Sequence, residues 1–114
     1  MASKLDAILY PVTDIAAAKA QFTALLGVEP AVDQPYYVHF QPADSLAVGL
    51  VPNGRDRGLT GGTPFWTVDD INAEVKALVE AGGTVTEDPH DVGGGKLVAV
   101  VQDAQGNVIG LAQS

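Results

Sequence analysis

The 114-residue sequence contains no cysteine and few basic residues. The lack of cysteine excludes disulfide bonds, thiolate metal sites and a cysteine nucleophile. Six Lys and Arg against fourteen Asp and Glu give a formal net charge of −8. Nucleic-acid phosphates and anionic membranes attract basic surfaces, so we expect neither as a partner. The charge favours a cationic small ligand over an anionic one, although an acidic surface also serves solubility alone.

Long apolar runs are also missing from the chain. No run approaches the roughly 18–20 residues that a membrane-spanning helix needs. The start, MASKLDAILY, lacks the basic and apolar stretches of a signal peptide. We therefore expect a cytoplasmic protein. The length suits about one domain, and the hydrophobic fraction of 46% is typical of globular proteins.

The sequence does contain an internal repeat. QPADSLAVGL, residues 41–50, returns as QDAQGNVIGL, residues 102–111, with glycine before the last leucine in both. At a shift of 56 positions, Asp14 meets Asp70. Both aspartates precede apolar residues at helical spacing and are natural helix N-caps. A repeat of this length indicates a fold built from two similar modules.

Each copy of the repeat predicts a strand, a capped helix and three further strands. The Pro42–Ser45 stretch predicts a hairpin turn, and 52–62 is typical of a flexible linker because it is rich in Gly and Pro. The predicted strands are 5–12, 28–33, 36–41 and 46–51 in the first copy, and 63–68, 84–87, 96–102 and 107–112 in the second.

This organisation predicts an α+β fold made of two βαβββ repeats. The modules cover about 4–52 and 62–113. Neither module alone buries both faces of its sheet. Paired edge to edge, they would form one curved, mixed, eight-stranded sheet with the helices outside and a concave inner face.

Three stretches resemble the vicinal-oxygen-chelate superfamily, which includes glyoxalase I, extradiol dioxygenases and the bleomycin- and fosfomycin-resistance proteins. They are YPVTDIAAAKAQFTALLGVEP, WTVDDINAEVKALVEAGGTV and DAQGNVIGL. The last is similar to the family's closing motif D-P-D-G-N-x-x-E-L. The resemblance covers nearly the whole chain and implies a single domain of this family, residues 1–114.

The resemblance also implies where a metal would bind. In metal-using members the residue before the last leucine is a glutamate ligand, and the other ligands lie early in the first strand of each half. Here the four positions are Ala7, Gly49, Thr63 and Gly110. These residues offer almost no donor atoms, so we expect no metal and no other cofactor. A strand register slipped by one residue would turn Asp6 inward in place of Ala7.

Alternation along the strands predicts which side chains face the inner side. Thr63 and Phe65 point inward, and Trp66 points toward the helices as part of the core. Family resemblance adds His39 and Val100, with Tyr37 on the same face as His39. We expect the two glycines to leave room for a ligand. The predicted ligand-binding residues are Tyr37, His39, Phe65, Thr63, Gly49, Gly110 and Val100.

Three functions remain open on the sequence alone. The leading one is metal-independent binding of an apolar, aromatic or cationic small molecule, as in antibiotic sequestration. The second is a metal-free isomerase or lyase that uses His39 as its base, with Tyr37 as hydrogen-bond partner. The third is a regulatory or interaction module without a ligand, in which Tyr37 and Phe65 simply fill the concave face.

Family resemblance further implies a homodimer with its clefts at the interface. Whether the two modules pair within one chain or are exchanged between chains stays open on the sequence.

Overall fold

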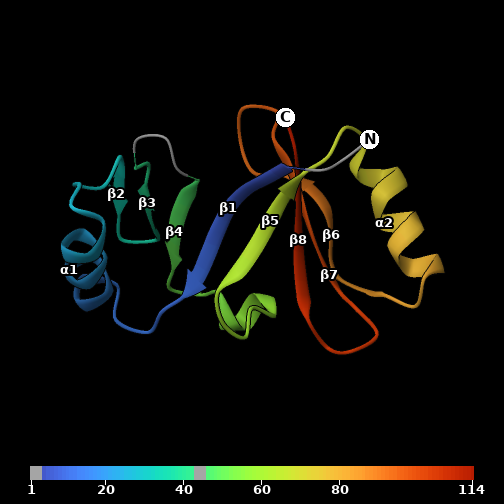
Figure 1. The fold of residues 1–114 in the computed structure, drawn as a ribbon, viewed down its shortest axis with the longest axis horizontal. Helices are drawn as coiled ribbons and strands as arrows, with labels where there is room; N and C mark the ends of the chain where they lie inside the picture. The colour runs from blue at the N-terminus through green and yellow to red at the C-terminus, as the bar shows by residue number, and fades with distance from the viewer. Residues whose placement is uncertain (1–3, 43–45) are drawn as a thin grey trace. The chain divides into compact units, whose positions relative to one another are not determined.

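A computed structural model describes residues 4–42 and 46–114 of the chain (Figure 1). The chain divides into two compact units, which we describe separately. The first unit is Ala7–Thr63, and the second unit combines the N-terminal segment up to Asp6 with Pro64–Ser114. Of the predicted hairpin turn Pro42–Ser45, residues 43–45 lie outside the described residues.

The first unit contains one helix and a small mixed sheet. In chain order its elements are β1 (Lys4–Pro11, which begins in the second unit), α1 (Ile15–Leu26), β2 (Val32–Gln34), β3 (Tyr37–Phe40) and β4 (Ala47–Val51). The strand order is β2-β3-β4-β1, and β1 runs parallel to β4. The other pairs are antiparallel.

The predicted strand 28–33 is wrong over its first four residues. Pro30 has no N–H to donate to a sheet, and pairing with β3 begins only at Val32. Val28 instead packs against the cluster beneath α1.

Helix α1 begins and ends where the sequence predicts. The Asp14 carboxylate accepts a hydrogen bond from the Ala17 N–H at 3.1 Å. Gly27 ends the helix in the left-handed conformation with φ of 70°, which glycine adopts without steric cost. Between these caps, Ala18 and Phe22 pack against the sheet in one apolar cluster. The buried members of that cluster are Ala18, Val38, Phe40 and Leu50.

The second unit repeats this arrangement. Its elements are β5 (Thr63–Thr67, whose first residue belongs to the first unit), α2 (Ile71–Glu80), β6 (Thr84–Asp91), β7 (Leu97–Gln102) and β8 (Val108–Gln113). The strand order is β5-β8-β7-β6, with β5 parallel to β8. Strand β6 runs four residues beyond the predicted 84–87 and includes Pro89. Its pairing with β7 is irregular between Val85 and Glu87 and again between Glu87 and His90.

Equivalent hydrogen bonds show that the two units are structural repeats. Asp70 caps α2 by accepting from the Ala73 N–H at 3.2 Å, as Asp14 caps α1. The prediction of an α+β fold with two βαβββ modules is confirmed, because the described residues form eight strands of mixed sheet and two α-helices. The buried cluster of the second unit is Val68, Ile71, Ala99, Val101 and Leu111.

The stretch 52–62 is more ordered than the predicted flexible linker. It contains a short 3₁₀ turn, Arg55–Arg57, and the Leu59 N–H donates to the Gly54 carbonyl at 2.9 Å. The Leu59 side chain is 1% exposed. Leu59 is an isolated apolar residue and forms no periodic pattern with its neighbours. Its burial could therefore not be predicted from the sequence.

The prediction that Trp66 is part of the core is also wrong. Trp66 pairs with Leu111, a member of the second cluster, but its side chain is 37% exposed and does not belong to the core. Neither helix in the described part of the chain is long and apolar enough to cross a membrane.

Candidate functional site

Each unit has a sheet face directed away from its helix, which we call the inner face. In the first unit, Val38 and Leu50 pack beneath α1. Because side chains alternate along a strand, Tyr37, His39 and Gly49 face the opposite side. His39 and Gly49 are direct partners in the β3–β4 pair. The three residues thus share one sheet face of the first unit, and their role in ligand binding stays a prediction.

The surface above Gly49 is covered by neighbouring side chains. A Cβ atom added to Gly49 would lie 2.7 Å from the Tyr37 hydroxyl oxygen and 2.9 Å from Tyr37 Cε1. It would also collide with Leu9 Cδ2. The Tyr37 hydroxyl therefore occupies the place where metal-using relatives would carry a glutamate side chain.

Gly110 in the second unit is covered in the same way. A Cβ atom there would lie within 2.5 Å of both Cδ atoms of Phe65, the direct strand partner of Gly110. The expectation that the two glycines leave room is wrong at both positions. Without a Cβ, each glycine lets a neighbouring aromatic ring settle onto the sheet backbone.

The four family ligand positions do not fit a divalent cation. Ala7, Gly49 and Gly110 have no side-chain donor atom, and the buried Thr63 hydroxyl donates to the Gly61 carbonyl at 2.9 Å. A divalent cation needs about three to six oxygen or nitrogen ligands. Among the described residues, no three or more His, Asp or Glu side chains come together as a metal site.

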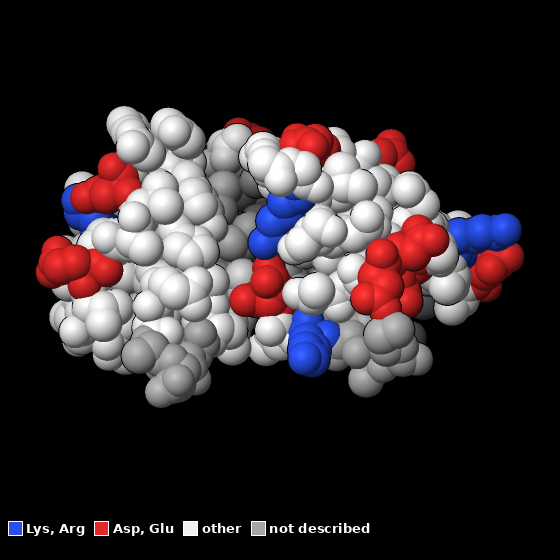
Figure 2. Space-filling view, turned by 90° about the horizontal axis from the view of Figure 1, so that it is seen from above, with Lys and Arg blue, Asp and Glu red and all other residues white. Residues whose placement is uncertain are grey.

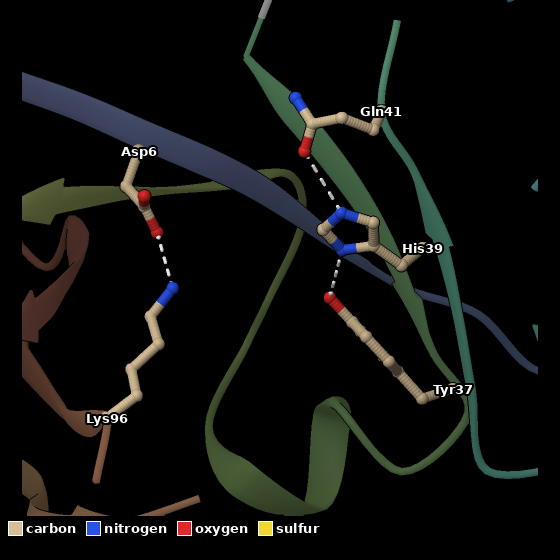
Figure 3. A network of polar contacts seen from close by, with 5 residues as sticks. All are labelled: Asp6, Tyr37, His39, Gln41 and Lys96. Atoms are coloured by element: carbon tan, nitrogen blue, oxygen red, sulfur yellow. Dashed lines mark hydrogen bonds and ion pairs between the residues drawn. The ribbon is translucent and has the colours of Figure 1, made fainter. Parts of the chain in front are cut away.

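The register of β1 with β4 places Ala7, and not Asp6, on the same sheet face as Gly49. Ala7 pairs with Ala47, two residues before Gly49. The Asp6 carboxylate oxygen lies 3.0 Å from Lys96 Nζ within the second unit (Figure 3). Asp6 is thus engaged in a partly exposed ion pair.

Tyr37, His39 and Gln41 form a row of polar side chains along β3 and its end (Figure 3). His39 Nδ1 lies 3.2 Å from the Tyr37 hydroxyl, and His39 Nε2 lies 3.2 Å from Gln41 Oε1. An amide oxygen only accepts hydrogen bonds, so Nε2 carries the proton and donates to Gln41. In the neutral imidazole, Nδ1 then accepts from the Tyr37 O–H. The arrangement favours one tautomer, in which His39 Nδ1 accepts the hydrogen bond of the Tyr37 hydroxyl.

Gln41 was not among the predicted site residues. It lies two residues after His39 and four after Tyr37 in the predicted strand 36–41, so it shares their parity, and that alternation could have identified it.

Burial separates the predicted ligand-binding residues into two groups. Thr63, Phe65 and Val100 are 2%, 3% and 0% exposed, and both glycines are buried as well. Tyr37 and His39 are half-buried, and Gln41 is exposed. Among these residues, the side chains that solvent reaches therefore come from β3 and the residue that follows it.

The closing motif DAQGN is a turn between β7 and β8. Asp103 Oδ1 accepts from the backbone N–H groups of Gln105 and Asn107, each at 2.8 Å, and Oδ2 accepts from Asn107 Nδ2 at 3.0 Å. The side-chain hydrogen bond from Asn107, together with these backbone bonds, holds the pKa of Asp103 below its ordinary value. The most specific family motif in this chain thus stabilises a hairpin.

Charged residues are dispersed over the face of the molecule drawn in Figure 2. The face drawn in Figure 2 carries several separate groups of acidic side chains, some beside a basic one, with wide uncharged areas between them. On this face the acidic side chains therefore form no single patch.

Comparison with known proteins places these features in a family. The sequence profile of the Glyoxalase/Bleomycin resistance protein/Dioxygenase superfamily matches residues 4–111. No curated protein matches the sequence.

Several solved structures share the fold at low sequence identity. A superfamily member from Vibrio splendidus 12B01 has a TM-score of 0.72 and 18% identity, over 99% of this chain and 100% of that one. The hypothetical protein BH1468 from Bacillus halodurans C-125 has a TM-score of 0.74 and 18% identity, over 100% and 96%. A single-residue variant of methylmalonyl-CoA epimerase from Streptomyces coelicolor, in complex with 2-nitronate-propionyl-CoA, has a TM-score of 0.74 and 17% identity, over 100% and 99%.

Proposed function

The chain belongs to the glyoxalase/bleomycin resistance protein/dioxygenase superfamily, and on this premise we propose that it binds a small apolar, aromatic or cationic molecule without a metal. One observation carries the proposal. The two positions where metal-using relatives have glutamate hold Gly49 and Gly110, and the side chains of Tyr37 and Phe65 lie over them. Restoring a glutamate would require these rings to move.

Binding of a small molecule requires no catalytic group. The lack of metal-coordinating side chains at the four family metal positions is therefore no obstacle to it. The inner face of the first unit combines an apolar side chain, Leu9, with the half-buried Tyr37 and His39. Such a mixture of apolar surface and a few polar groups is typical of small-molecule sites. The acidic net charge supports a cationic ligand, and sequestration of an antibiotic is one function of this kind.

A thermal-shift screen tests the proposal directly. The purified protein is heated with bleomycin-type and other cationic or aromatic drugs, in EDTA and in excess Mn²⁺. We expect stabilisation by at least one compound, equally in both buffers, because a ligand present at 100 times its Kd adds about 2.7 kcal/mol to the free energy of unfolding. Failure of every compound would count against the proposal, and so would stabilisation that needs Mn²⁺.

The row of Tyr37, His39 and Gln41 favours a second function, a metal-free isomerase or lyase with His39 as base. Its hydrogen bonds fix one tautomer of the imidazole, and one protein of the same fold is an epimerase. Proton NMR in D₂O would detect exchange of a C–H proton next to the carbonyl of a candidate substrate. This function requires the exchange to stop in His39→Ala and to persist in His90→Ala, whose side chain lies in the second unit.

We further propose that the protein is a homodimer, as family resemblance implies. Light scattering coupled to size exclusion gives the mass in solution. A mass near 11.7 kDa, that of one chain, would contradict this proposal.

A further inference from the structure

The turn that follows β4 contains a chemically reactive pair of residues, Asn53 and Gly54. The chain has three asparagines, at positions 53, 72 and 107, and only Asn53 precedes a glycine. Asparagine is among the thermolabile residues of proteins. Glycine after it removes the side chain that would hinder attack of the next backbone nitrogen on the asparagine amide. Asn53 is also exposed to solvent, so water can reach its side chain.

The reaction open to this pair is deamidation, which proceeds in two steps. In the first step, Gly54 N loses its proton to a solvent base and attacks Asn53 Cγ. An N–C bond forms there, and the side-chain amide nitrogen leaves as ammonia. In the second step, water adds to one carbonyl of the resulting succinimide ring, and one N–C bond breaks. The product is aspartate or isoaspartate at position 53, and water is the only reagent consumed.

The fold keeps the attacking nitrogen out of this reaction. The Gly54 N–H donates to the Val51 carbonyl at 3.2 Å, and Gly54 is buried. The Gly54 carbonyl accepts from the Leu59 N–H at 2.9 Å. A solvent base cannot reach an amide proton that is buried and hydrogen-bonded until the surrounding structure opens. In the closed turn, Gly54 N therefore keeps its proton and is not a nucleophile.

Two side chains hold the turn closed around Gly54. The Leu59 side chain is 1% exposed, and the Arg55 guanidinium donates to the Thr60 carbonyl at 3.3 Å. A Cβ atom added to Gly54 would lie 2.8 Å from Pro11 Cβ and 3.3 Å from Leu59 Cδ1. Gly54 is thus packed between the end of β1 and the Leu59 side chain, and the turn opens only when these contacts break.

We propose that Asn53 is a deamidation site whose reaction is controlled by local opening of residues 52–62. Deamidation is slow compared with the opening and closing of a loop, so its rate follows the fraction of molecules that are open. The modification is also one-way. Isoaspartate adds a methylene group to the main chain, and the close packing of Gly54 against Pro11 leaves no room for it. This inference is independent of the proposed ligand binding.

Peptide mapping by mass spectrometry measures deamidation at each asparagine during incubation in a mildly alkaline buffer. In the chain unfolded by guanidinium chloride, we expect Asn53 to react faster than Asn72 and Asn107. In the native wild type, the rate at Asn53 should fall about tenfold or more, as it does when about one molecule in ten or fewer is open. Equal rates in the native and unfolded chain would overturn the proposal, and so would an Asn53 that is no faster than the other asparagines when unfolded.

Leu59→Ala removes the buried side chain that holds the turn. It should raise the native rate at Asn53 about tenfold or more, because deletion of a buried leucine raises the open fraction by at least that factor. Leu111→Ala is the matched control, since it deletes the same atoms from the buried cluster of the second unit. The rate at Asn53 should stay unchanged there, because the local opening does not involve that unit.

Arg55→Ala keeps the test decisive if Leu59→Ala fails to fold. The Arg55 side chain is exposed, so its removal deprives the closed turn only of the hydrogen bond to Thr60. The rate at Asn53 should rise about threefold. A native rate that both variants leave unchanged would overturn control by local opening. An equal rise in Leu111→Ala would also overturn it, because global unfolding would then produce the reactive state.

Discussion

Substituting Gly110 by alanine tests the claim that an aromatic ring has taken the place of a side chain. The new Cβ atom would lie within 2.5 Å of two ring carbons of Phe65, far inside van der Waals contact. Phe65 is only 3% exposed, so its ring cannot swing into solvent. Overpacking of a buried site costs about 1–3 kcal/mol. For a domain of this size, that lowers the Tm by roughly 4–12 °C.

Gly61→Ala is the matched control. Nothing lies within 4 Å of a Cβ atom added at Gly61, and its backbone is not left-handed. The same change of residue should be neutral there, or stabilising by about 0.4–1 kcal/mol, because alanine restricts the unfolded chain more than glycine does.

A double-mutant cycle ties the cost to the Phe65 ring. In a Phe65→Ala background, Gly110→Ala has open space to occupy, so we expect a coupling energy of about 1 kcal/mol or more between the two changes. Urea unfolding followed by fluorescence of Trp66, the only tryptophan, gives the four free energies. The reasoning is refuted if Gly110→Ala lies within about 0.5 kcal/mol of the wild type or if the two changes are additive.

Three further substitutions probe other features, each by urea unfolding. Leu59→Ala should lower the free energy of unfolding by about 2–5 kcal/mol, because the side chain is fully buried. A change near zero would mean that residues 52–62 are the flexible linker that the sequence predicts. Asp70→Ala removes the cap of α2 and should cost about 0.5–2 kcal/mol, whereas an unchanged midpoint would mean that the cap is not formed. Asp103→Asn should destabilise at pH 7. The pKa of Asp103 is lowered in the folded protein, so its stabilisation is present above the unfolded pKa of about 3.9 and is lost as the pH falls through the folded value. The difference between variant and wild type should therefore shrink below about pH 4, and a constant difference would contradict this assignment.

The sequence predicts the parts of this fold that depend on local chemistry. The spacing of apolar residues after Asp14, the glycine at position 27 and the equivalent Asp70 predict both helices and the repeat. Strand alternation places Tyr37 on the same face as His39, whose orientation the family resemblance implies. These features depend on residues near one another in the chain, so one sequence is enough to find them.

Prediction fails where the outcome depends on residues from different strands. The sequence shows that Gly110 lacks a side chain, but only the register of β5 and β8 shows that Phe65 fills the space. Trp66 has the right parity for the core, yet packing leaves it partly exposed.

The irregular course of β6 has a consequence for behaviour at high concentration. An outermost strand with free N–H and C=O groups is a template on which another chain can add a strand. Here Pro89 has no N–H to offer, and two register irregularities interrupt the row of backbone groups. β2, the outermost strand of the first unit, is only three residues long. Both outer strands are thus poor seeds for fibrous aggregates, and the protein should tolerate crowding without polymerising through its strand edges.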